Sequence, residues 1–157
     1  MTTPHDRVAY GAHVFPFAGL HSSDEGLPPR PLLPVRVRAP GGAWSRPFNA
    51  VLDTGSTWCL LQTRLARDLG FSVEGPEEEM RGAGGRFKSA LATCDVGVMD
   101  AQFPEVTCLE VDAVDFAIPL DEDALDISVL GRNVLRLFDL SVSHRKGRIE
   151  LRLSHGV

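Results

Sequence analysis

The sequence predicts an all-β domain with one or two short helices. Apolar segments rich in β-branched and aromatic residues recur after residue 30, and glycine, proline or polar turn residues separate them. Near the end of the chain, Ile149, Leu151 and Leu153 alternate with polar residues, as in a strand with one buried face. Residues 66–70, which close with a glycine, and residues 131–137 are the segments that suit a helix.

The first 30 residues are predicted to form an N-terminal extension (residues 1–30) ahead of one domain at residues 31–157. The extension is rich in proline, glycine, histidine and serine, and residues 12–17 are its strand-like segment. Residues 27–34 suit an extended, proline-rich connector. We therefore expect the extension to be partly flexible or to add one strand.

Strands and turns alternate through the domain itself. Residues 35–38 and 48–53 flank the sequence APGGA, which is typical of a hairpin turn. Further strands are expected at residues 89–99, at residues 106–111, and in a terminal hairpin at residues 140–143 and 148–153.

An acidic residue at the end of an apolar strand is the chemical centre of the chain. Residues 48–61 read FNAVLDTGSTWCLL, so the strand ends on Asp53 and the apolar pattern resumes after Gly55. Glycine permits close approach of backbones in such a turn. We expect Asp53 to be semi-buried, where lost hydration favours its protonated form and makes acid/base chemistry accessible.

Two further segments add specificity, because a lone Asp-Thr-Gly arises by chance in on the order of a few per cent of chains of this length. Residues 77–91 read EEEMRGAGGRFKSAL, two strand-compatible arms around glycines, which predicts a mobile hairpin. Residues 127–135 read ISVLGRNVL, a second apolar strand that ends in glycine before a helix-compatible segment.

This order of elements resembles the retropepsin-like aspartic proteases, and more closely their bacterial members, over roughly residues 31–153. The resemblance implies a closed β-barrel or sandwich with a glycine-tipped flap hairpin over the substrate. The catalytic loop corresponds to Asp53, Thr54 and Gly55. The flap tip corresponds to Gly82, Ala83, Gly84 and Gly85, and the strand beneath the catalytic loop to Leu130, Gly131, Arg132 and Asn133.

The resemblance also implies roles for the neighbours of Asp53. Thr54 would hydrogen-bond across to a second catalytic loop, and the hydroxyl of Ser56 would donate to a carboxylate oxygen of Asp53. Substrate subsites would be lined by Trp58, Ile127 and Val129, although a tryptophan beside a core strand is more often a packing residue.

One position departs from the retroviral pattern. The family partner of Arg132 is an aspartate four residues after the catalytic one, and Thr57 stands at that position here. We therefore expect Arg132 to find another acceptor, in a partner chain or in the acidic run at residues 121–126. That run lies along the cleft in the family, where it would either favour basic substrate residues or act as solubilising charge.

The resemblance implies an aspartic endopeptidase that needs no cofactor. Its chemistry requires two carboxyl groups that share a proton, whereas this sequence carries one Asp-Thr-Gly. We therefore expect a homodimer that acts on peptide or protein substrates, with one Asp53 from each chain. The terminal hairpin would either join the dimer sheet or cover an edge of its own chain.

Other functions fit the sequence less well. A retropepsin-like binding or dimerisation module, catalytically weak or inactive, remains the alternative because a fold does not guarantee activity. Acyl transfer from Ser56 or Cys59 lacks a placed base. The five histidines are dispersed and the three cysteines show no CxxC spacing, so we expect no metal site and buried free thiols.

The composition fits a globular domain, with 43% hydrophobic and 24% charged residues. Its net charge of −5 and scattered basic residues argue against nucleic acid as a partner. The apolar runs are too short to span a membrane, and the N-terminus lacks the apolar core of a signal peptide. We therefore expect a cytoplasmic protein without membrane association.

Overall fold

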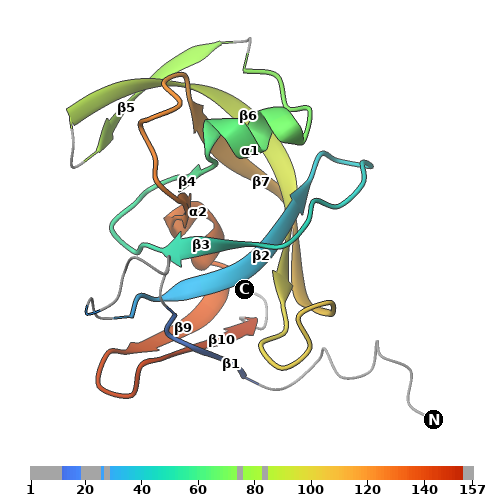
Figure 1. Ribbon diagram of the computed structural model, residues 1–157, viewed down its shortest axis with the longest axis vertical. Coiled ribbons are helices and arrows are strands. Elements are labelled where there is room, and N and C mark those ends of the chain that lie inside the picture. Colours follow the sequence, from blue (N-terminus) through green and yellow to red (C-terminus); the bar gives the residue numbers. More distant parts are fainter. Residues whose placement is uncertain (1–11, 19–25, 27–28, 74–75, 83–84, 154–157) are drawn as a thin grey trace.

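The computed structural model describes residues 12–18, 26, 29–73, 76–82 and 85–153. Within this part of the chain, seven strands form the larger sheet: β2 (Leu32–Arg38), β3 (Phe48–Leu52), β4 (Cys59–Leu60), β5 (Glu77–Gly82), β6 (Gly85–Met99), β7 (Thr107–Pro119) and β8 (Ser128–Leu130). A smaller sheet contains β1 (His13–Pro16), β9 (Phe138–Ser143) and β10 (Arg148–Leu153). Two short helices, α1 (Thr63–Asp68) and α2 (Arg132–Leu135), complete the fold (Figure 1).

The larger sheet closes into a barrel. Its strand order is β2-β3-β8-β4-β7-β6-β5, and a further pairing between β2 and β6 joins the first and sixth strands of that order. The strand β5 extends β6 beyond the barrel as one arm of a hairpin, with Met80 opposite Phe87. The prediction of an all-β closed barrel with a hairpin and short helices is confirmed.

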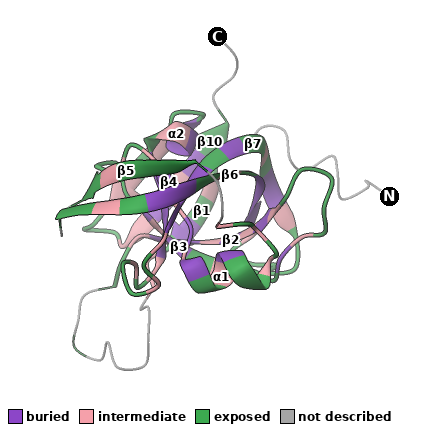
Figure 2. Ribbon diagram, turned by 90° about the horizontal axis from the view of Figure 1, so that it is seen from above, coloured by how far each residue is buried: buried purple, intermediate pink, exposed green. Residues whose placement is uncertain are grey.

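The interior of the barrel is apolar because its strands alternate in burial. In β2, the side chains of Leu33, Val35 and Val37 are at most 1% exposed. All three cysteines are buried free thiols, as the sequence predicted, and burial is the main cause that raises the pKa of each to about 12. Figure 2 shows where buried residues recur along the strands.

The smaller sheet is built from the two ends of the described chain. β10 lies between β1 and β9 and pairs antiparallel with both, so both of its edges are used within one chain. The strand predicted at residues 12–17 is confirmed as β1, and the terminal hairpin is confirmed as β9 and β10. Phe15, Ile149 and Leu151 on the inner face of this sheet belong to the hydrophobic core.

The sequence underestimated one strand. β7 runs for 13 residues, well past the end predicted at residue 111. The apolar pattern is interrupted where Ala113 adopts a positive φ of 56° and donates its backbone N–H to Oδ1 of Asp95 over 3.1 Å. The register of β6 and β7 shifts between Cys94 and Val96, at the same level of the hairpin. A bulge therefore carries the pairing of β6 and β7 past residue 111, where the predicted strand ended.

The two helices are short. Gly70, with a φ of 76°, follows the end of α1 and donates its N–H to the carbonyl of Arg67, which confirms its prediction as a C-terminal glycine. Neither helix in the described residues has the length or apolarity needed to cross a membrane.

Candidate active site

Asp53 is the first residue after β3, and its backbone is held by the neighbouring strand. β3 and β8 run parallel, with Leu52 beside Leu130, and the N–H of Asp53 donates to the carbonyl of Leu130 over 3.1 Å. The position of the acidic residue is therefore fixed by the edge where two buried strands end. This arrangement lets a polar loop leave the barrel directly after an apolar strand.

The turn that follows fixes the carboxylate of Asp53. Its Oδ1 accepts the N–H of Gly55 over 2.8 Å, and its backbone carbonyl accepts the N–H of Ser56 over 3.2 Å. A Cβ atom at Gly55 would lie 3.1 Å from this Oδ1, so glycine gives the carboxylate its room. The side chain of Asp53 is thus oriented by the backbone of its own loop.

Asp53 is exposed, and the expectation of semi-burial is wrong for the single chain. Thr54 and Gly55 beside it are exposed as well. The sequence showed apolar residues on both sides of the motif, but the turn lifts these three residues off the barrel surface. In one chain alone, water therefore reaches the carboxylate freely.

Gly131 supports the loop from below. A Cβ atom there would lie 2.2 Å from the carbonyl oxygen and 2.4 Å from the carbonyl carbon of Trp58, distances that real Cβ atoms do not adopt. The next two N–H groups, of Arg132 and Asn133, donate to the carbonyls of Ser56 and Thr57 over 2.8 and 3.1 Å. The start of α2 and the Asp53 loop are thus joined backbone to backbone.

Two side chains at the start of α2 complete this support. Nη2 of Arg132 donates to Oγ1 of Thr57 over 2.9 Å. The prediction that the acceptor of Arg132 lies in a partner chain or in the acidic run at residues 121–126 is therefore wrong. Asn133 accepts the N–H of Cys59 over 2.9 Å and donates to the carbonyl of Asp115 over 2.7 Å. The bridging role of this amide was missed, because its partners lie far away in the sequence.

Ser56 does not have the partner that the sequence suggested. Its hydroxyl donates to the carbonyl of Trp58 over 2.7 Å, within the same turn. A hydroxyl has one proton to donate. The proton of Ser56 is therefore given to the backbone carbonyl of Trp58 and not to Asp53.

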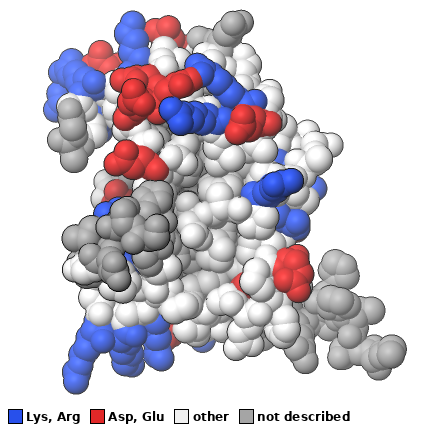
Figure 3. All heavy atoms as spheres, in the orientation of Figure 1, with Lys and Arg blue, Asp and Glu red and all other residues white. Residues whose placement is uncertain are grey.

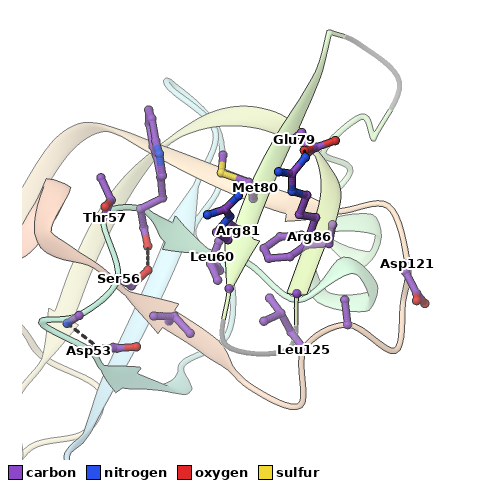
Figure 4. A pocket seen from close by; sticks show the side chains of 17 residues that line it. Asp53, Ser56, Thr57, Leu60, Glu79, Met80, Arg81, Arg86, Asp121 and Leu125 are labelled. Atoms are coloured by element: carbon purple, nitrogen blue, oxygen red, sulfur yellow. Dashed lines mark hydrogen bonds and ion pairs between the residues drawn. The ribbon is translucent and has the colours of Figure 1, made fainter.

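The Asp53 loop lines a cleft of about 940 Å³, and the β5–β6 hairpin forms its opposite wall (Figure 4). Of the predicted flap residues, Gly82 and Gly85 line this cleft, whereas Ala83 and Gly84 lie outside the described residues. Trp58 and Val129 of the predicted subsites also line it. Ile127 is half-buried and does not line the cleft, whereas Leu125 and Val129 on either side of it do.

Charged side chains of both signs line the cleft, and further ion pairs lie near it. Arg86 meets Glu79 across the hairpin at 3.0 Å, and Glu122 of the acidic run is held by Arg64 and Arg67 of α1. Figure 3 shows charges of both signs gathered over the β5–β6 hairpin. Arg81 lines the cleft and makes no ion pair with the described residues. The cleft wall is therefore mixed in charge rather than uniformly acidic.

A group of three possible metal ligands lies elsewhere in the described chain. His13, Asp100 and Cys108 place one donor atom each within 4.8 Å of the others. None of the three lines the Asp53 cleft. The cleft itself is lined by the Asp53 loop, by charged side chains of both signs and by apolar side chains.

Comparison with protein-family models decides the relationship. The model described as aspartyl protease matches residues 33–134, a span that contains both the Asp53 loop and Gly131. The chain belongs to the aspartyl protease family. The resemblance noted from the sequence is thereby confirmed at the family level.

A solved structure supports the fold of this aspartyl protease family member. A retropepsin-like aspartic protease from Rickettsia conorii is 19% identical, with a TM-score of 0.54, and the match covers 90% of this chain and 91% of that one. EIAV protease in complex with an inhibitor is 18% identical, with a TM-score of 0.49, over 71% of this chain and 89% of that one. The comparison with curated proteins gave no match.

Proposed function

We propose that this chain is an aspartic endopeptidase that acts as a homodimer, with Asp53 from each of two chains at one shared site. The observation that carries the proposal is the Asp53 carboxylate, exposed and oriented by its own loop beside a cleft large enough for a peptide. Family membership supports the same chemistry.

The second carboxylate is proposed to come from a partner chain because the cleft offers no substitute beside Asp53. Glu79 lines the cleft but is engaged by Arg86. Asp121 lies at the opposite end of the cleft from Asp53 (Figure 4). Two copies related by a two-fold axis would supply the pair from one motif per chain.

The exposure of the loop supports such a pairing. Asp53, Thr54 and Gly55 are all exposed in one chain, and a second loop facing them would cover them. The two carboxyl groups would then lie in a less hydrated place, where like charges cannot both ionise and one proton is shared. The hydroxyl group of Thr54 is proposed to donate a hydrogen bond to the catalytic loop of the partner chain.

The reaction follows from this shared proton. The ionised carboxylate takes a proton from water, and the water oxygen attacks the peptide carbonyl carbon. The protonated carboxyl group gives its proton to the carbonyl oxygen. The tetrahedral intermediate, which now carries two hydroxyl groups, then collapses and the C–N bond breaks. The leaving amine takes a proton from the carboxyl group that had accepted one from water, and the other carboxylate takes a proton back from one hydroxyl group, which restores the shared proton of the pair. No cofactor is needed for any step.

The β5–β6 hairpin is proposed to act as the flap. It forms the wall opposite Asp53, and an extended substrate beneath it would offer backbone groups to both walls. Trp58 and Val129 would contact substrate side chains, since both line the cleft. Closure of the hairpin over a bound peptide would exclude water from the reacting bond.

The test compares the parent protein with Asp53→Asn on a diverse peptide pool between acidic and neutral pH. General acid/base groups contribute about 10²- to 10⁴-fold, so we expect Asp53→Asn to lower the cleavage rate by at least that factor. Asp121→Asn is the matched control, because it removes a carboxylate from the far end of the same cleft. Its cleavage rate should stay within a few-fold of the parent.

Sedimentation of the same samples tests the assembly. The parent and Asp53→Asn should both sediment as dimers, because the substitution keeps the shape of the side chain. A parent protein that cleaves as a monomer would contradict the shared site. A parent that cleaves nothing at any pH would favour the alternative, a binding module that retains the fold.

A further inference from the structure

A cluster of three chemically different donors lies at the junction of the two sheets. His13 belongs to β1 of the smaller sheet, Asp100 directly follows β6, and Cys108 is the second residue of β7. The β6–β7 hairpin brings the last two together, since Met99 pairs with Thr107. β1 supplies the third, and the three donor atoms lie within 4.8 Å of one another.

Asp100 is held in position for a ligand. Its Oδ1 accepts the backbone N–H groups of Gln102 and Phe103 over 2.7 and 3.0 Å, which fixes the plane of the carboxylate. Both of these bonds use the same oxygen, so Oδ2 is the oxygen left to bind a ligand. An outer contact that orients a ligating carboxylate is a general feature of metal sites in proteins.

Cys108 places a thiol beside that carboxylate in a largely dry environment. The residue is 5% exposed and forms no disulfide. Burial, and then the charge of Asp100, raise the pKa of the Cys108 thiol to about 12, so the free thiol keeps its proton at neutral pH. A divalent cation between the two groups would reverse both effects and stabilise the thiolate.

We propose that His13, Asp100 and Cys108 bind one divalent transition-metal ion with the ligand preferences of zinc. Zinc accepts thiolate, imidazole and carboxylate ligands together, whereas magnesium and calcium take oxygen ligands almost exclusively. Three protein ligands leave the fourth position to water. Binding releases the thiol proton to solvent and involves no redox step.

A metal ion at this site would connect the smaller sheet to the barrel. β1 pairs with β10 in the smaller sheet, whereas Asp100 and Cys108 belong to the hairpin of the barrel, so the ion would tie the two sheets together. In Figure 1, β1 runs close to the turn between β6 and β7. The cluster shares no residue with the Asp53 cleft. The proposed metal site is therefore independent of the proposed peptidase activity.

The experiment uses the untagged full chain after removal of metals with a chelator. Co²⁺ is added first, because a cobalt–thiolate bond gives an ultraviolet charge-transfer band and the visible bands report the coordination number. Zn²⁺ is then added as a competitor, and the bound metal is counted by elemental analysis. We expect one ion per chain, a thiolate band, and displacement of Co²⁺ by Zn²⁺.

Single substitutions assign the ligands. His13→Ala removes the imidazole, and Asp100→Asn keeps an oxygen for the two N–H groups while it removes the charge. Loss of an outer-sphere partner already costs about 10- to 100-fold in affinity, so each variant should bind at least tenfold more weakly. Cys108→Ala should lose the thiolate band. Cys94→Ala, another buried free thiol, is the matched control and should bind as the parent does.

Two results would overturn the proposal. One is a parent protein that binds neither Co²⁺ nor Zn²⁺ at micromolar concentrations. The other is binding whose affinity is unchanged in both His13→Ala and Asp100→Asn, which would assign the metal to another place. If Cys108→Ala does not fold, those two variants decide the question, since their side chains are only half-buried.

Discussion

The guanidinium of Arg132 donates from Nη2 to the hydroxyl oxygen of Thr57 over 2.9 Å, so a hydrogen bond from a charged donor to a neutral acceptor joins α2 to the loop that carries Asp53. The backbone bonds from Arg132 to Ser56 and from Asn133 to Thr57 run alongside it. The retroviral pattern implies an ion pair at this place. Here the hydroxyl of Thr57 provides a contact for Arg132 without a second charge.

Thr57→Asp should strengthen this contact by restoring an ion pair. Both residues are exposed, so the gain in the free energy of unfolding is expected to be about 0.5 to 1 kcal/mol. Urea unfolding at low and high salt measures it, and the gain should shrink as salt increases. Thr57→Val, which loses the hydrogen bond, should cost about 0.5 to 1 kcal/mol. Equal stability of both variants at low salt would contradict this account.

Gly131→Ala should be among the most damaging single substitutions in the chain. The added methyl group would lie 2.2 Å from the Trp58 carbonyl oxygen, and only a shift of the backbone relieves that clash. We expect a loss of about 3 kcal/mol or more in urea unfolding. Gly82→Ala is the control, since its methyl group would meet the ring of Phe87 at 3.3 Å. The prediction is wrong if the two variants are equally stable.

Asp95 should make stability depend on pH in the acidic range. The N–H of Ala113, and then the guanidinium of Arg38, lower the pKa of this carboxyl group below its ordinary value of 3.8. A lowered folded-state pKa gives stability that is fully present above the unfolded-state pKa and is lost as the pH falls through the folded-state pKa.

The parent should therefore be more stable than Asp95→Asn at pH 6, and the difference should shrink as the pH falls below 3.8. Urea unfolding across this range measures the difference. Arg38→Gln should keep part of the pH dependence, because the Ala113 N–H remains in place. A difference between parent and Asp95→Asn that stays constant down to pH 2 would refute the prediction.

Arg81 should favour acidic side chains in a substrate, on the proposed peptidase function. It lines the cleft without an ion pair among the described residues, whereas Arg86 beside it is paired with Glu79. An exposed charge contact is worth about 0.5 to 1 kcal/mol, so Arg81→Gln should lower kcat/KM for acidic peptides roughly two- to fivefold. Matched peptides with Glu, Gln or Lys at each position measure the effect. Arg86→Gln should change the Glu-to-Gln ratio less, and identical ratios in the parent and Arg81→Gln would rule out the role.

The sequence was sufficient for features that local patterns determine. The apolar run before Asp53 predicted the end of β3, and the glycines at residues 82–85 predicted the β5–β6 hairpin, because strand and turn chemistry act over a few residues. The terminal strands were found for the same reason. The family resemblance added the strand at Gly131, which lies against the Asp53 loop.

Features that depend on distant residues could not be predicted in this way. Asp53 is exposed because no part of the chain that the structure describes covers the turn, and its hydrophobic neighbours in the sequence did not indicate this exposure. The hydroxyl of Ser56 donates to the Trp58 carbonyl because of the shape of the turn that contains both residues. His13, Asp100 and Cys108 come together from three strands' ends, and their spacing in the sequence matches no metal-binding motif.

The placement of β10 between β1 and β9 has a consequence for how the polypeptide must be handled. A shortened protein that starts at Leu32 would match the boundaries of the family model closely, yet it would leave one flank of β10 with bare amide and carbonyl groups. An unpaired strand edge of this kind can form hydrogen bonds with a strand of another molecule, including a second copy of the same protein. By pairing with β10, β1 therefore protects the protein from edge-to-edge aggregation.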